Sequence, residues 1–147
     1  MRKNQVSKMM SVWGALAVLA AGSVQASGTP IRQTAVAQAL PAREVGILVD
    51  VGEEYGLSGD ELKLLLVIRK IENGGPGVEM GVGSNIPGHR ARRYAGQPDL
   101  SLRIQARWAA GTIRDRFAGN LESFAKRYCP PKWRHWTSMA RHWMNRG

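Results

Sequence analysis

The sequence predicts a small, mainly α-helical domain, and three observations support this fold class. Five segments between residues 44 and 144 place apolar residues three and four positions apart, which is the spacing of one helix face. No stretch alternates apolar and polar residues as a half-buried strand does. The chain has 147 residues, and residues 27–147 remain once an N-terminal leader is set aside, which is enough for one domain and too few for two.

The first 26 residues read as a secretory signal peptide. Basic residues at positions 2, 3 and 8 precede an apolar core at 9–21, and Val24-Gln25-Ala26 offers small residues at the usual cleavage positions. The apolar core is short and interrupted, which disfavours a membrane anchor. We therefore expect cleavage near Ala26, no stable membrane anchor afterwards, and a periplasmic or secreted protein.

The part of the chain after the leader is basic. Its 18 Lys and Arg residues against 11 Asp and Glu leave a net charge of about +7, compared with +10 for the full chain. Such a charge suits nucleic acid, anionic lipid or an anionic polymer. Because no segment reads as a base-contacting helix, and because export favours the bacterial wall polymer, we expect no nucleic-acid partner.

The predicted elements follow in order along the chain. Residues 27–43 have weak periodicity and are expected to form a strap or linker before the domain at 44–147. A first helix is expected over 44–55. The glycine-rich sequence from Gly74 to Gly96 is expected to be irregular and lacks the spacing of a phosphate-binding loop. After the second helix and this loop, three more helices are expected over residues 101–117, 121–128 and 133–144.

The second predicted helix, over 60–72, carries the strongest candidate for chemistry. Ser58 and Glu61 have the spacing of a capping box at its start, and Gly74 or Gly75 is expected to end it in a left-handed conformation.

Glu72 closes this helix and shares a face with Leu65 and Ile68. A carboxyl on an apolar face at the negative end of a helix dipole should keep its proton, which is what a general acid needs. The alternative is an ordinary surface ion pair with Arg69, three residues earlier.

The order of motifs around Glu72 resembles the lytic transglycosylase and lysozyme-like superfamily. Leu66–Gly74 contains Ile-x-x-Ile-Glu-x-Gly, similar to the block in which that family's catalytic glutamate ends a helix, with Asn73 in place of the usual Ser. Met80-Gly81-Val82-Gly83 is similar to the loop that follows. Residues 120–130 are similar to the block that ends in the family's active-site tyrosine, which matches Tyr128. The resemblance spans about residues 44–145.

The resemblance implies a lysozyme-like fold and cleavage of the β-1,4 bond between N-acetylmuramic acid and N-acetylglucosamine in peptidoglycan. Glu72 would be the catalytic acid, and Met80, Gly81, Val82, Tyr128 and Glu79 would contact the substrate. The family's lytic transglycosylases need one carboxyl, because a hydroxyl of the muramic sugar attacks and forms an anhydro end. No cofactor or metal is implied, and a monomer is expected.

Two alternatives remain open from the sequence. An endo-N-acetylglucosaminidase or muramidase would use Glu79 or Asp99 as a second carboxylate, although Asp99 after Pro98 reads as a helix cap or turn residue. A non-catalytic wall-binding protein could keep the fold, in line with Asn73 and Cys129-Pro130-Pro131.

The remaining candidate residues have weaker functional readings. The lone Cys129 is expected to be buried, and the three histidines lack metal-ligand spacing. The tryptophans suit either the core or a sugar-stacking wall; they are Trp108, Trp133, Trp136 and Trp143.

Overall fold

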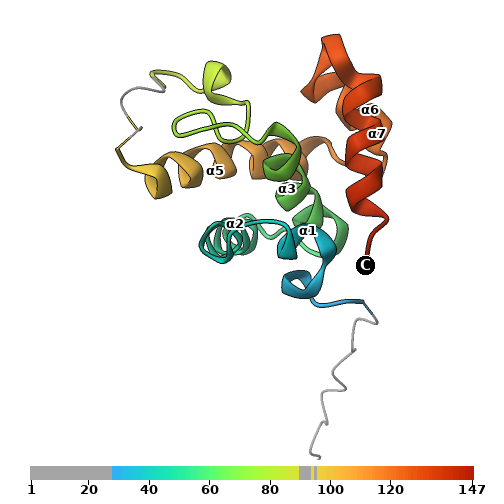
Figure 1. Cartoon of the computed structure of the whole chain (residues 1–147). Coiled ribbons are helices and arrows are strands. Elements are labelled where there is room, and N and C mark those ends of the chain that lie inside the picture. Colours follow the sequence, from blue (N-terminus) through green and yellow to red (C-terminus); the bar gives the residue numbers. More distant parts are fainter. Residues whose placement is uncertain (1–27, 90–93, 95) are drawn as a thin grey trace, which may run out of the picture.

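The computed structural model describes residues 28–89, 94 and 96–147 (Figure 1). The predicted signal peptide lies outside these residues, as does the arginine-rich sequence at 90–93. The described residues are mainly helical, as predicted, and they include no β-strand. No helix among them is long and apolar enough to cross a membrane. In chain order the elements are η1 (Ile31–Gln33), α1 (Ala35–Gln38), α2 (Ala42–Glu54), α3 (Gly59–Glu72), η2 (Gly83–Asn85), α5 (Pro98–Arg116), α6 (Leu121–Tyr128), η3 (Pro130–Lys132) and α7 (Trp133–Met144).

The segment predicted as a strap contains two short helices, η1 and α1. The Thr34 side chain caps α1 by accepting a hydrogen bond from the Ala37 backbone N–H (3.4 Å). Val36 and Ala37 are buried against the rest of the domain, which holds this segment in place. The weak periodicity of the sequence did not predict these helices, because a single turn is too short to show a repeat.

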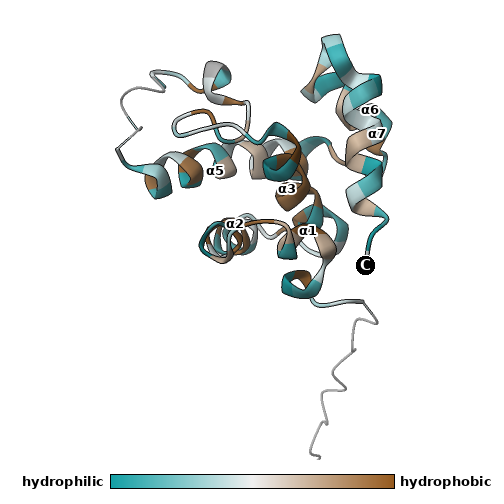
Figure 2. Ribbon diagram, viewed as in Figure 1, coloured by the Kyte–Doolittle hydropathy of each residue, from teal (hydrophilic) through white to brown (hydrophobic). Residues whose placement is uncertain are grey.

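Helix α3 runs through the centre of the domain and packs against α1, α2, α5 and α7. Its five residues from Leu64 to Ile68 have no exposed surface, so the helix is surrounded on most sides. Figure 2 shows this hydrophobic helix in the middle of the fold, with hydrophilic stretches on the outer helices. The predicted capping box is present, and the Ser58 N–H donates to Glu61 (3.4 Å).

Helix α3 ends differently from the prediction. Asn73, and not Gly74 or Gly75, takes the left-handed conformation, with φ of 43°. Asn tolerates the left-handed region better than other non-glycine residues, which explains why Asn73 can end the helix in place of a glycine. Gly74 is needed for another reason, since a Cβ there would lie 1.9 Å from the Val78 carbonyl oxygen, where the loop folds back on itself.

The later helices form as the sequence predicts. The apolar stripe of α5 is buried against α2 and α3, and the Asn120 side chain caps α6 by accepting from the Ser123 N–H (2.9 Å). Helices α6 and α7 pack side by side as a hairpin on one side of the domain (Figure 1). The hairpin contributes Phe124 and Trp136 to the core, with 1% and 2% of their surfaces exposed.

Candidate active site

Glu72 is the last residue of α3 and is partly buried. One carboxyl oxygen, Oε1, accepts a hydrogen bond of 3.0 Å from the indole N–H of Trp136 on α7. Burial raises the pKa of Glu72 above the ordinary 4.5, and the Trp136 hydrogen bond partly opposes that rise. The predicted environment of Glu72, a carboxyl on an apolar face with a raised pKa, is therefore present.

The second oxygen of Glu72 lies beside Gly81. A Cβ at position 81 would be 2.5 Å from Oε2, and Gly81 has φ of +68°, so only glycine fits there without strain. Within the described part of the chain no donor reaches Oε2, and this oxygen is not among the buried side-chain atoms left without a partner. Oε2 therefore lies against the Gly81 backbone and accepts no hydrogen bond from the described residues.

Tyr128, at the end of α6, completes one side of the site. Its hydroxyl donates to the Met80 carbonyl oxygen (3.1 Å), and its ring lies 5.4 Å from that of Trp136. Burial, and then the charge of Glu72, raise the pKa of Tyr128 well above its ordinary value. Tyr128 thus remains a neutral phenol that is near enough to Glu72 to be affected by its charge, while its hydroxyl binds the loop backbone.

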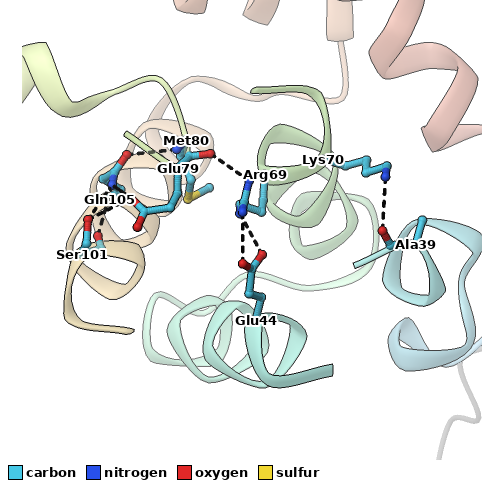
Figure 3. A network of polar contacts seen from close by, with 8 residues as sticks. All are labelled: Ala39, Glu44, Arg69, Lys70, Glu79, Met80, Ser101 and Gln105. Atoms are coloured by element: carbon cyan, nitrogen blue, oxygen red, sulfur yellow. Dashed lines mark hydrogen bonds and ion pairs between the residues drawn. The ribbon is translucent and has the colours of Figure 1, made fainter. Parts of the chain in front are cut away.

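The alternative pairing of Glu72 with Arg69 is wrong. The Arg69 guanidinium is buried and binds both oxygens of Glu44 on α2, at 2.8 and 3.0 Å. Its third contact is the Glu79 carbonyl oxygen, at 3.2 Å. Arg69 therefore joins α2 to the loop that follows α3 (Figure 3). Within the described residues, Glu72 has no cationic partner.

The structure places Glu79 inside the domain, although the sequence predicted contact with substrate or the role of a second carboxylate. Glu79 is only 4% exposed, and its carboxylate accepts hydrogen bonds from the Ser101 hydroxyl (2.8 Å) and the Gln105 amide of α5. Gln105 also accepts from the Met80 N–H (3.0 Å). Figure 3 shows these side chains converging on the loop from α5, so Glu79 fixes the backbone that leads into Gly81.

The side chains of Met80 and Val82 are buried, so at these positions the loop presents backbone atoms and the bare Cα of Gly81 to the site. Asp99 does not cap α5, because Gln97 is the N-cap and no side chain makes a capping hydrogen bond. Asp99 lies in the first turn instead, and its carboxylate pairs with Arg43 (3.0 Å).

The structure adds Trp136 to the site, which the sequence alone did not single out. From its helical spacing, Trp136 was expected to lie either in the core or in a sugar-stacking wall. In the structure it is a core residue, and its indole N–H donates to Glu72. Trp108 is the most exposed of the four candidate tryptophans, at 41%. Trp133 and Trp143 are partly buried and lie under cationic side chains, as with Lys126 over Trp133 at 4.5 Å.

The described ranges include Cys129 and all three histidines. They contain no group of three or more His, Cys, Asp or Glu residues placed to hold a metal ion. Cys129 is partly buried beside Tyr128, where burial had been expected.

Comparison with known proteins gives no relatives. No family model matches the chain, and no match was found among curated proteins or solved structures. The geometry of the site is therefore the basis for assigning a function.

Proposed function

We propose that the protein cleaves the glycan strands of peptidoglycan as a lytic transglycosylase, with Glu72 as the single acid and base. The observation that carries this proposal is the Glu72 carboxyl. One of its oxygens is held by Trp136, the other lies beside Gly81 with no hydrogen-bond donor from the described residues, and burial favours the protonated form. This combination is what protonation of a glycosidic oxygen requires.

In the proposed reaction the Glu72 proton passes to the oxygen between the two sugars as the bond to the muramic carbon breaks. Glu72, now a carboxylate, takes the proton from a hydroxyl of the muramic sugar as that oxygen attacks the same carbon. The products are a free N-acetylglucosamine hydroxyl and an anhydro-muramic end, and Glu72 is protonated again. Such acid and base assistance typically contributes about 10²- to 10⁴-fold in rate.

A two-carboxylate hydrolase is less well supported by the same site. Of the two candidates for the second carboxylate, Glu79 is buried in its contacts with α5 and Asp99 is paired with Arg43. A mechanism in which the sugar supplies its own nucleophile needs neither of them.

Digestion of purified sacculi by residues 27–147 and by Glu72→Gln tests the proposal, with the fragments identified by mass spectrometry. We expect anhydro ends from the wild type and a loss of at least about 100-fold in Glu72→Gln, because an amide cannot donate the proton. Reducing ends in place of anhydro ends would indicate a hydrolase. Binding to sacculi with no release of fragments would indicate a wall-binding protein.

A further inference from the structure

A pocket of about 250 Å³ opens next to Tyr128, on the side formed by α5 and α6. Tyr128 belongs both to this pocket and to the Glu72 site, because its hydroxyl binds the Met80 carbonyl oxygen. Tyr128 therefore connects the Glu72 site with the pocket. Its lining residues come from the glycine-rich loop and both helices, namely Val82, Asn85, Trp108, Thr112, Arg116, Arg127 and Tyr128.

Two arginines from different helices line this one pocket. Arg116 ends α5 and Arg127 lies in the last turn of α6, and both are exposed. Position near a helix C-terminus stabilises each of them singly, but it does not explain why both face the same hollow. Two guanidinium groups converging on a small concave space form a site for an anion.

Neither arginine is neutralised by a carboxylate in the described part of the chain. The other arginines of α5 have acidic partners, as with Arg103 and Asp50 (3.7 Å) or Arg107 and Glu54 (3.1 Å). Asp115 lies beside Arg116 in the sequence, but its carboxylate pairs with Arg114 at 3.1 Å. The positive charge of the pocket is thus left for a ligand.

The pocket continues over Trp108 into a second hollow of about 470 Å³, with Trp108, Thr112 and Arg116 common to both. The far hollow is lined by the aromatic and aliphatic residues Tyr55, Ile86 and Ile104, and by Arg107 and Asp115, which pair with Glu54 and Arg114. A groove with unpaired arginines at the Tyr128 end and aromatic and aliphatic residues beyond them fits an extended chain with carboxylates and short aliphatic side chains. A neutral sugar strand alone would leave both arginines without a partner.

We propose that this groove binds the peptide stem of the muramic sugar, with a stem carboxylate held between Arg116 and Arg127. The proposal depends on the proposed function, since it names the substrate group read beside the same site. Once its lactyl group is joined to the stem, the glycan of peptidoglycan has no charge of its own. The stem carboxylates are therefore the groups that these arginines would recognise.

The test compares sacculi that retain their stem carboxylates with sacculi in which these are converted to neutral amides by carbodiimide and ammonia. Both are first freed of phosphate polymers with hydrofluoric acid. The wild type should cleave the charged sacculi about ten-fold faster at limiting substrate, and this ratio should approach one in Arg116→Gln/Arg127→Gln. The control Arg32→Gln/Arg103→Gln loses the same charge outside both hollows and should keep the wild-type ratio.

Sedimentation with sacculi of the two kinds gives a readout that does not need catalysis. The Glu72→Gln protein should bind charged sacculi more tightly than amidated ones, and this difference should vanish when the two pocket arginines are also replaced. Equal cleavage and equal binding of both sacculi by the wild-type pocket would overturn the stem proposal and leave the proposed cleavage intact. A preference seen only before phosphate removal would also overturn it, by assigning the pocket to a phosphate polymer.

Discussion

At Glu72 two opposing effects act on one carboxyl group. Removal from water disfavours the charged form, and the Trp136 N–H favours it. Desolvation is the larger effect, so the pKa is raised while one oxygen is still held in a fixed direction. The hydrogen bond therefore orients the Glu72 carboxyl without lowering its pKa back to the ordinary value.

The first prediction concerns the pH profile and the Trp136 hydrogen bond. In the proposed mechanism Glu72 donates a proton, so kcat/KM should fall as the pH rises through the raised pKa of this group. Trp136→Phe removes a donor that stabilises the carboxylate, so the pKa should rise further and the alkaline limb should move to higher pH. The measurement is the rate of fragment release from sacculi between about pH 4 and pH 9, a range that brackets the ordinary pKa of Glu.

Trp143→Phe serves as the matched control for this prediction. Trp143 is on the same helix as Trp136, but its ring contacts Lys70, His142 and Arg146. The alkaline limb of the pH profile of Trp143→Phe should coincide with that of the wild type. If Trp136→Phe left the limb unmoved or moved it to lower pH, the hydrogen bond would not be acting on the proton donor.

Glu72 could be found from the sequence, whereas its partners could not. The helical face, the capping box and the glycine after the helix are local signals, and they place the carboxyl correctly. Trp136 is 64 residues away along the chain and reads only as an apolar position of α7. The pairing of Arg69 with Glu44, 25 residues apart, also has no local signal. Sequence spacing therefore suggested only Glu72, three residues away, as a partner for Arg69.

At the scale of elements, the glycine-rich loop after α3 is held by more contacts than its composition suggests. Arg69 binds the Glu79 carbonyl oxygen from one side, and Ser101 and Gln105 bind the Glu79 carboxylate from the other. Gly81 follows two residues later and lies against Glu72. The loop is thus anchored to α3 and α5 immediately before the point where it meets Glu72.

The second prediction separates this anchoring role of Glu79 from a role in catalysis. Glu79→Gln keeps the shape and the accepting oxygen that Ser101 and Gln105 use, so sacculus cleavage should stay within a few-fold of the wild type. Glu79→Ala leaves buried donors unpaired and should lower the free energy of unfolding by about 1–3 kcal/mol. Chemical denaturation and initial cleavage rates check the two parts.

A second carboxylate in a hydrolase would give the opposite result for the glutamine variant. Loss of a nucleophile or base typically costs 10² or more in rate, with the fold intact. A large loss of activity in Glu79→Gln at unchanged stability would therefore indicate that Glu79 takes part in catalysis.

The helices themselves were largely predictable, and their ends were less so. The stripe in α5 and the Asn120 cap of α6 are repeated or local patterns, and both are present. The two short helices before α2 are stabilised by burial of Val36 and Ala37, which no single-turn pattern reveals. The loop path depends on the Glu79 contacts with α5, which bring together residues 22 to 26 positions apart.

At the scale of the whole molecule, the site is assembled from three separate parts of the chain. Helix α3 supplies Glu72, the loop supplies Gly81, and the α6–α7 hairpin supplies Tyr128 and Trp136. Phe124 joins the hairpin to the domain, with its ring 5.3 Å from Tyr128 and 6.0 Å from Trp136. The same packing that docks the hairpin therefore sets the positions of both aromatic residues of the site.

The third prediction follows from this shared packing. Phe124 is 1% exposed, and its ring also meets Phe117 edge-on at 5.9 Å, so Phe124→Ala should lower the free energy of unfolding by about 3–5 kcal/mol. Leu100→Ala, at a position 42% exposed, should change it by less than about 0.5 kcal/mol. Under conditions where Phe124→Ala is still folded, its cleavage rate should also fall, because Tyr128 and Trp136 lose the ring that they pack against. Near-normal cleavage by the folded variant would mean that the contacts of the hairpin with α3 alone are enough to hold the site together.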